Sequence, residues 1–365
     1  MFQDNTVINE YNLKKISLAD KIFEHPHQAF KSIHITGTNG KGSVAKMVFS
    51  ILQKAGKKVG CFTSPHLNDI RERIETDEGQ ISKKDFVYYL NKILRSGVSL
   101  SYFETLVMIS FLYFKDKKCE YAVIEVGMGG SVDATNIIRP IMSCITSIGV
   151  DHEKYLWSTA KEIAIHKAGI IKPGVPVVIN KKNPIIEKTA KEKKAPIIFA
   201  KKKPTNLLWA HQEENAGLAY SICKKLWISE NEITQGLKHV QHPGRLQYIT
   251  KNLLIDGAHN IDGLHILKTY LTSIRKKYKK IIYCFGLKEG KDPRELIVPI
   301  FGKDKEYIIV KEKSIMLEDV ASLAKKMVGE KYILQTPTQI KKLAKQNPST
   351  LYVVFGSLYM IGAFI

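Results

Sequence analysis

The chain has 365 residues, of which 44% are hydrophobic and 25% charged, a composition typical of a globular protein with substantial cores. Its formal net charge is +21, but the basic residues are spread along the chain, which argues against a dedicated nucleic-acid-binding arm. There is no run of about 18 apolar residues, and an N-terminus with Asp4 and Glu10 lacks an apolar signal region, so we expect neither membrane spanning nor secretion.

The five cysteines indicate a cytoplasmic location. Their number is odd and no C-x-x-C spacing occurs. Cys61, Cys144 and Cys284 fall within strand-like runs, so we expect small buried side chains with free thiols in a reducing compartment.

Strand and helix patterns alternate through the first two thirds of the chain. A helical lead-in over residues 1–31 precedes a predicted strand at 32–36 and a predicted helix at 44–55. Further strands are predicted at 58–63, 120–126, 142–148, 175–179 and 196–199, with helices at 83–95 and 104–115 among the connections. This alternation predicts an α/β domain with a mainly parallel sheet covered on both faces.

A second α/β series begins near Leu253. Its predicted strands lie at 253–256, 280–286, 306–310, 331–334 and 350–355, again with helical connections. The Pro243-Gly244 pair precedes this series and is a plausible linker. We therefore predict two domains, residues 1–242 and residues 243–365.

The segment Gly37-Thr38-Asn39-Gly40-Lys41-Gly42-Ser43 has the features of a phosphate-binding loop. It lies between a strand and a helix, its glycines allow backbone N–H groups to converge, and the helix N-terminus and Lys41 add positive charge. The spacing differs from the common G-x-x-x-x-G-K-S/T because Gly42 separates Lys41 from Ser43. The alternative is an ordinary glycine-rich turn.

Potential metal ligands follow three of the predicted strands. Glu125 ends the run 120–125, His152 follows the strand at 142–148, and Ser64 lies just after the strand at 58–62. The carboxyl edge of a parallel sheet is where α/β proteins bind ligands, and a carboxylate opposite a phosphate loop commonly binds Mg²⁺. Each residue also has a structural explanation: a solvent-facing glutamate, a hydrogen-bonded histidine or a turn serine.

Two further groups are ambiguous from spacing alone. Lys167 lies where Gly169 could end a helix, and a lysine in a last helical turn is favoured by the macrodipole, so spacing alone indicates a structural residue. Asp256 and His259 follow the strand at 253–256, where they could meet a ligand or serve as turn and capping residues.

Taken together, these motifs resemble the folylpolyglutamate synthase and dihydrofolate synthase family of Mur-type ATP-dependent ligases. The matching motifs are GTNGKGS at 37–43, TSPHL at 63–67 with RERI at 71–74, EVGMGG at 125–130 with DATN at 133–136, Asp151-His152, KAGIIKPG at 167–174, His211-Gln212 with Asn215-Ala216, PGR at 243–245, DGAHN at 256–260 and GSLY at 356–359. The resemblance implies a P-loop Mur-ligase-like first domain and a smaller Rossmann-like α/β second domain that closes over the nucleotide and binds glutamate.

The resemblance also implies roles for individual residues. Ser64, Glu125 and His152 would bind Mg²⁺, and a carbamylated Lys167 would help bind a second Mg²⁺; Lys41, His152 and Lys167 would be catalytic. The nucleotide would meet Thr38, Asn39, Gly40, Lys41, Gly42, Ser43, Asn215, Arg245, Asp256 and His259, and the pterin would meet Phe103, Glu104, Thr105, Val132, Asp133 and Ala134.

Four positions depart from the pattern of the family. Ser131 replaces a commonly basic residue, Trp157 a glycine, His166 the glutamate before the modified lysine, and Ile261 a proline. None of these removes a proposed ligand, but Ser131 and Trp157 affect the expected contacts with the substrate.

The implied reaction joins L-glutamate to dihydropteroate, to the glutamate tail of a reduced folate, or to both. ATP would convert the acceptor carboxylate into an acyl phosphate, and ADP and phosphate would be released. We expect a monomer with small-molecule substrates and without nucleic-acid or membrane partners. Two alternatives remain: a Mur-type ligase acting on a peptidoglycan precursor, and a nucleic-acid-dependent P-loop ATPase suggested by the charge.

Overall fold

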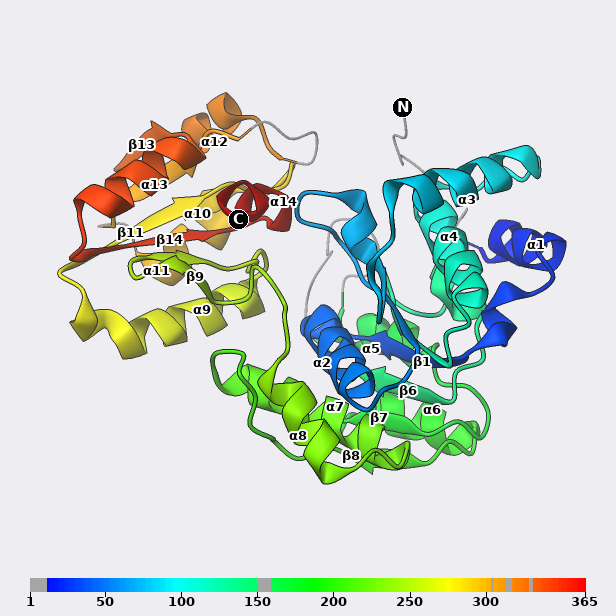
Figure 1. The fold of residues 1–365 in the computed structure, drawn as a ribbon. Coiled ribbons are helices and arrows are strands. Elements are labelled where there is room, and N and C mark those ends of the chain that lie inside the picture. Colours follow the sequence, from blue (N-terminus) through cyan, green and yellow to red (C-terminus); the bar gives the residue numbers. More distant parts are fainter. Residues whose placement is uncertain (1–11, 150–158, 303–304, 313–316, 328–330) are drawn as a thin grey trace. The chain divides into compact units, whose positions relative to one another are not determined.

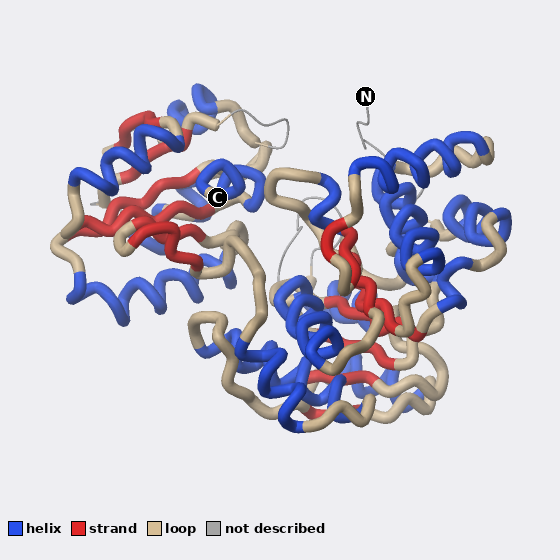
Figure 2. Tube along the Cα trace, in the orientation of Figure 1, coloured by secondary structure: helices blue, strands red, loops and turns tan. Residues whose placement is uncertain are grey.

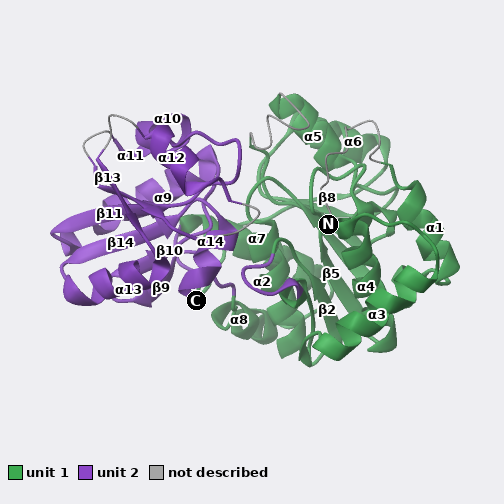
Figure 3. Ribbon diagram, turned by 90° about the horizontal axis from the view of Figure 1, so that it is seen from above, with its two compact units in different colours: residues 1–65, 71–206, 210–241 green, residues 66–70, 207–209, 242–365 purple. Residues whose placement is uncertain are grey.

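The computed structural model describes residues 12–149, 159–302, 305–312, 317–327 and 331–365. The chain divides into two compact units (Figure 3). Unit 1 comprises residues 1–65, 71–206 and 210–241, and unit 2 comprises residues 66–70, 207–209 and 242–365. Each unit contains its own sheet, with helices packed around it (Figure 2).

Within the described residues, unit 1 contains an eight-stranded sheet in the order β4-β3-β2-β5-β1-β6-β7-β8. The strands from β2 to β8 in this order pair in parallel, whereas β3 and β4 form an antiparallel edge. Their bounds are β1 Lys31–Thr36, β2 Val59–Phe62, β3 Ile74–Thr76, β4 Gly79–Gln80, β5 Tyr121–Glu125, β6 Met142–Ile145, β7 Val177–Ile179 and β8 Ile197–Phe199.

Helices cover this sheet on both faces, as the sequence predicts. Their bounds are α1 Lys14–Ile22, α2 Lys41–Lys54, α3 Lys83–Arg95, α4 Tyr102–Asp116, α5 Ala160–Ala168, α6 Pro184–Glu192, α7 Ala210–Lys225 and α8 Glu230–Lys238 (Figure 1). Gly60 and Phe62 of β2 face helix α4, because a Cβ on Gly60 would lie 2.5 Å from the ring of Phe114, and the rings of Phe62 and Phe103 are 5.8 Å apart.

The parallel register extends this face across the sheet. Phe62 pairs with Ile124, and Ile124 pairs with His34 of β1. Paired residues of neighbouring strands point to the same side of a sheet, so His34 lies on the α4 face. Ile33 and Ile35 point to the opposite face.

Unit 2 contains a six-stranded sheet in the order β13-β12-β11-β14-β10-β9, in which only β9 pairs antiparallel among the described strands. The strands are β9 Gln247–Thr250, β10 Leu253–Ile255, β11 Lys280–Phe285, β12 Tyr307–Val310, β13 Tyr332–Gln335 and β14 Thr350–Phe355. The helices are α9 Ile261–Ile274, α10 Pro293–Leu296, α11 Val298–Phe301, α12 Val320–Lys326, α13 Pro337–Gln346 and α14 Leu358–Ile361.

Alternating strand residues build two cores in unit 2. Ile281, Tyr283 and Phe285 of β11 join the cluster formed with α9 to α12, whereas Cys284 joins the cluster formed with α13 and α14. Figure 1 accordingly shows α9 and α13 on opposite sides of this sheet. The period of two in the strand sequences thus produces a three-layered α/β unit.

The predicted α/β architecture and the parallel sheets are confirmed, with differences in detail. Helix α2 begins at Lys41, not at residue 44, because Gly42 and Ser43 enter its first turn. The helical lead-in is described from residue 12, and its α-helix ends at Ile22. Short β3, β4 and β9 were not predicted, since strands of two to four residues carry little periodic signal. All five cysteines are buried and free, which confirms the expectation for Cys61, Cys144 and Cys284.

Candidate active site

The glycine loop after β1 requires residues without a Cβ at two points. Gly37 has φ +152°, and a Cβ there would lie 1.9 Å from Oγ1 of Thr146. Gly40 has φ +89° at the N-cap of α2, and a Cβ there would lie 2.6 Å from Oδ1 of Asn215. The structure therefore brings Asn215, which we predicted to contact the nucleotide, next to the loop.

The segment that follows β6 braces the same loop. Oγ1 of Thr38 donates to the carbonyl of Gly149 at 2.9 Å and accepts from the N–H of Gly149 at 3.0 Å. The hydroxyl of Thr146 donates to the carbonyl of Asn39 at 2.6 Å, and the N–H of Asn39 donates to Oγ of Ser147 at 2.9 Å. These bonds fix a backbone that would otherwise be mobile because of its glycines.

Lys41 is the first residue of α2, and its side chain folds back over the loop. Its Nζ donates to the carbonyl oxygens of Gly37 at 3.0 Å and Thr38 at 3.2 Å. The ammonium and the positive end of a 14-residue helix therefore act at one place, which suits a phosphate chain. Ser43 lies in the first turn of α2 and is buried.

Two predicted metal ligands lie together beside this loop. Glu125 ends β5, the strand next to β1, and its side chain is buried. The N–H of Ser64 donates to Oε2 of Glu125 at 2.9 Å. A carboxylate and a hydroxyl are hard oxygen donors, the type that Mg²⁺ prefers, so this pair fits the ion chemically. The predicted third ligand, His152, and the departure at Trp157 lie outside the described residues.

A half-buried lysine on the same side of the sheet was missed by sequence reasoning. Lys46 of α2 forms an ion pair with Glu75 of β3 and acts electrostatically on Cys61 and Glu125. Burial lowers the pKa of Lys46, but the charge and hydrogen bond of Glu75, with the more distant charge of Glu125, outweigh this effect and the pKa is raised. Lys46 therefore adds positive charge near Glu125. Only the pairing of β2 with β3 brings these residues together.

Lys167 lies in the last turn of α5, which ends before Gly169 as expected. It is buried, and the adjacent glycine segment packs against its backbone: a Cβ on Gly130 would lie 2.5 Å from the carbonyl oxygen of His166 and 3.2 Å from Cα of Lys167. Two of the residues that depart from the family pattern are in contact here, because Oγ of Ser131 lies 2.9 Å from Nδ1 of His166. Lys167 is thus held next to the segment that follows Glu125.

Asp133 organises the predicted pterin segment. Its Oδ1 accepts the N–H of Thr135 at 2.9 Å and the hydroxyl of Thr135 at 2.6 Å, and its Oδ2 accepts the N–H of Met128 at 2.9 Å. Burial raises the pKa of Asp133, and these hydrogen bonds oppose the rise. Internal donors therefore occupy the acceptor positions of the carboxylate, which anchors the glycine segment.

Phe103 is the other predicted pterin residue that meets this segment directly. A Cβ on Gly127 would lie 2.4 Å from its ring. Glu104 is engaged in capping α4, since its Oε2 accepts the N–H of Ser101 at 2.8 Å, and the hydroxyl of Thr105 donates to the carbonyl of Ser101 at 2.8 Å. Glu104 and Thr105 therefore shape the start of α4. Val132 is half-buried and Ala134 is buried beside Asp133.

His34 is a site neighbour that sequence reasoning did not select. It is fully buried in β1, two residues before Thr36, and its Nε2 lies 2.8 Å from Oγ1 of Thr135. Burial, assisted by the charge of Lys172, lowers the pKa of His34 to about 3. The available signal was a polar residue between Ile33 and Ile35 in a central strand.

Unit 2 groups three predicted nucleotide contacts at the end of β10. Oδ1 and Oδ2 of Asp256 accept the N–H groups of Ala258 and Leu246, each at 2.8 Å. Burial raises the pKa of Asp256 and the charge of Arg245 opposes this. A Cβ on Gly257 would lie 2.6 Å from the Arg245 guanidinium, which also donates through Nε to His242 at 3.1 Å.

The same turn continues into α9. Nδ1 of His259 lies 2.7 Å from the carbonyl of Gly257, so the ring is held against the turn. Oδ1 of Asn260 caps α9 by accepting the N–H of Gly263 at 2.9 Å. Ile261, the fourth departure, is the first residue of α9 and is exposed.

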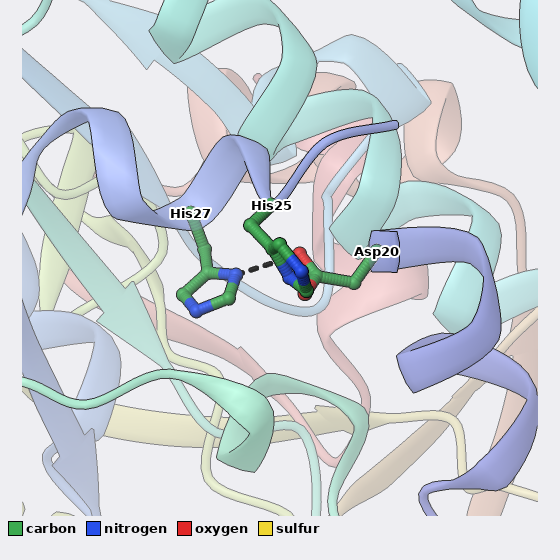
Figure 4. Close-up of side chains that lie close together, drawn as sticks. All are labelled: Asp20, His25 and His27. Carbon is green, nitrogen blue, oxygen red and sulfur yellow. Dashed lines mark hydrogen bonds and ion pairs between the residues drawn. The ribbon is translucent and has the colours of Figure 1, made fainter. Parts of the chain in front are cut away.

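Asp20, His25 and His27 form a cluster whose potential ligand atoms all lie within 4.8 Å of one another (Figure 4). Nδ1 of His25 lies 2.6 Å from Oδ2 of Asp20, and Nδ1 of His27 lies 2.6 Å from Oδ1. The two imidazoles thus donate hydrogen bonds to different carboxylate oxygens of Asp20. Burial raises the pKa of Asp20, but the bonds from His27 and His25 outweigh this and the pKa is lowered. The cluster joins the end of α1 to the turn before β1.

A P-loop at the carboxyl edge of a parallel sheet defines unit 1 as a nucleotide-binding α/β unit. Family models sharpen this class: the Mur ligase middle domain matches residues 35–255, and the dihydrofolate synthetase C-terminal domain matches residues 238–365. The chain belongs to the folylpolyglutamate synthase and dihydrofolate synthase family of Mur-type ligases.

Similar proteins extend over nearly the whole chain. The dihydrofolate synthase/folylpolyglutamate synthase of Bacillus subtilis is 30% identical, with 92% of this chain and 90% of the relative covered. A probable dihydrofolate synthetase of Schizosaccharomyces pombe is 29% identical, with 93% of each covered. Neither rival, the peptidoglycan ligase or the nucleic-acid-dependent ATPase, is favoured by these relatives.

Solved structures agree in fold. A folylpolyglutamate synthase from Thermotoga maritima has a TM-score of 0.82 and 29% identity, with 97% of this chain and 92% of that chain covered. The Mycobacterium tuberculosis enzyme, solved with ADP and AMPPCP, has a TM-score of 0.85 and 25% identity, with 96% and 94% covered. A bifunctional enzyme solved with Mn, AMPPNP and L-glutamate has a TM-score of 0.84 and 25% identity, with 96% and 92% covered.

None of the described helices combines the length and apolar character needed to cross a bilayer.

Proposed function

We propose that this protein joins L-glutamate to the carboxyl group of a pteroate-type acceptor, using ATP and releasing ADP and phosphate. The observation that carries the proposal is the meeting of Lys41, Glu125 and Ser64 at one sheet edge in a chain of the folylpolyglutamate synthase and dihydrofolate synthase family. Relatives solved with adenine nucleotides, Mn and L-glutamate support the same set of ligands.

A carboxylate is a poor electrophile, so the reaction needs an activated acyl group. Transfer of the γ-phosphoryl group of ATP to the acceptor carboxylate forms an acyl phosphate, and the α-amino group of glutamate then displaces phosphate. Lys41, held above the loop, neutralises charge on the transferred group, and the N–H groups at the start of α2 hold the phosphates. These contributions are electrostatic and positional.

Glu125 and Ser64 would hold Mg²⁺, with His152 as the expected third ligand. When bound, the ion neutralises negative charge on the phosphates. We further infer that Lys167 is carbamylated and binds a second ion: its buried position beside Gly130 favours a group shielded from solvent. Electron density or mass on Nζ beyond that of lysine would support the modification, and an unmodified lysine in bicarbonate-containing buffer would exclude it.

Residues 1–242 would bind ATP and the pterin, while residues 243–365 would bind glutamate and meet the nucleotide through Arg245, Asp256 and His259. Because one chain carries both sets of residues, we infer that the monomer is the functional form. The five buried thiols support a cytoplasmic location. Light scattering of the purified protein tests whether it is a monomer, and a stable dimer under assay conditions would overturn that inference.

The decisive experiment measures ADP release by purified protein with ATP, Mg²⁺ and L-glutamate. Dihydropteroate and a reduced folate that already carries glutamate are offered separately, and omission of glutamate is the control for uncoupled hydrolysis. Acceptor-dependent ADP and a product heavier by one glutamyl residue are expected with one or both acceptors. If neither compound stimulates ADP release, the ligase assignment fails.

A further inference from the structure

The position of His34 imposes a cost in folding stability. Its side chain is fully buried in the central strand of unit 1, and its Nδ1 has no hydrogen-bond partner among the described residues. Burying a polar atom without a partner costs stability, and an apolar side chain would avoid that cost. The role of a histidine at this position must therefore lie in the hydrogen bond of its other ring nitrogen, Nε2.

The hydrogen bonds define the direction of a short relay. The hydroxyl of Thr135 donates to Oδ1 of Asp133 at 2.6 Å, the same oxygen that accepts the N–H of Thr135. That hydroxyl is then left as the acceptor for Nε2 of His34 at 2.8 Å, which makes His34 the Nε2–H tautomer. Its lowered pKa keeps the ring neutral and in this donor role at physiological pH. The relay runs from His34 through Thr135 to Asp133.

The relay ends on the glycine segment that follows Glu125. Asp133 accepts the N–H of Met128, so its position determines how the segment 127–133 folds back. The hydroxyl of Thr36, on the same face of β1 as His34, donates to the carbonyl of Gly129 at 2.7 Å. The strand that leads into the phosphate loop therefore holds the glycine segment at two points.

We propose that His34 is a positioning residue for the acceptor substrate, acting through Thr135 and Asp133 on the segment 127–134. This inference rests on the proposed function, in which that segment lines the pterin site. His34 is buried and meets no substrate itself. Its effect falls on the acceptor rather than on ATP, because the phosphate loop is braced independently by residues 146–149.

Two pairs of variants of the full-length protein test this inference. His34→Leu removes the donor, and His34→Gln places an N–H donor at a similar distance from the backbone. Thr135→Val removes the relaying hydroxyl at constant shape, and Thr135→Ser retains it. For each variant, ADP release gives KM for ATP and, in a separate titration, KM for the acceptor. The acceptor is dihydropteroate or the reduced folate, whichever the wild-type protein uses.

His34→Leu and Thr135→Val are expected to raise KM for the acceptor about tenfold, the effect of losing one well-placed buried hydrogen bond. KM for ATP should change less than about twofold, and His34→Gln and Thr135→Ser should each recover most of the acceptor affinity. The melting temperature of His34→Leu should stay within about 4 °C, because the lost hydrogen bond is offset by removal of an unpartnered polar atom.

An unchanged acceptor KM in both His34→Leu and Thr135→Val overturns the positioning role. So does an equal rise in both KM values, or a His34→Gln variant no better than His34→Leu. If His34→Leu does not fold, Thr135→Val against Thr135→Ser decides the question alone. Failure of the proposed function is recognised separately, because the unchanged protein would then release no acceptor-dependent ADP.

Discussion

Replacing Lys41 by alanine should remove most of the catalytic rate while leaving the fold intact. The ammonium now bonds two loop carbonyls at 3.0 and 3.2 Å, so it is held at the mouth of the phosphate loop. A unit charge about 4 Å from the transferred phosphoryl group contributes roughly 4 kcal/mol at an effective dielectric constant of about 20. Measured losses of single transition-state contacts are about 2.7–4 kcal/mol, which corresponds to a rate loss of about a hundredfold to a thousandfold.

The assay is ADP release at saturating ATP, with acceptor and glutamate present. The matched control is Lys54→Ala, which removes the same charge from the exposed last turn of the same helix and should change the rate less than about twofold. Stability should fall by only about 1 kcal/mol in Lys41→Ala, since its two hydrogen bonds are only partly buried. A Lys41→Ala enzyme that keeps more than about a tenth of the normal rate would refute the role assigned to the lysine.

Three further changes have defined outcomes. Glu125→Gln should raise the Mg²⁺ concentration for half-maximal ADP release at least about tenfold, and an unchanged Mg²⁺ titration would remove Glu125 from the metal site. Gly130→Ala should lower the rate about tenfold or more, because its Cβ would lie 2.5 Å from the His166 carbonyl and displace the turn that carries Lys167; full activity would show that this packing is not needed. The pKa of Asp20 is lowered in the folded protein, so its stabilising effect is present above the unfolded pKa and is lost as pH falls through the folded pKa. Asp20→Asn should therefore reduce the loss of melting temperature at acidic pH. The same loss in the variant and the wild-type protein would contradict the hydrogen-bonded cluster.

Local patterns carried most of the fold prediction. The apolar alternation around Ile33 and Ile35, the glycines at 37–42 and the helical spacing after them predicted β1, the loop and α2 with an error of three residues at the helix start. Helix α3 was predicted at its observed bounds, residues 83–95. These signals succeed because short-range sterics and the burial of one face act on neighbouring residues.

The sequence by itself determined the α/β class, the phosphate loop and the family motifs, since each is encoded in residues that are close along the chain. Only the tertiary structure decided which distant residues meet. Parallel pairing of β2 with β5 brings Ser64 to Glu125 across 61 positions, and the turn that follows β5 brings Thr135 to His34 across 101. The pairing of β2 with β3 places Glu75 beside Lys46. Such contacts depend on strand order and register, which no local pattern specifies.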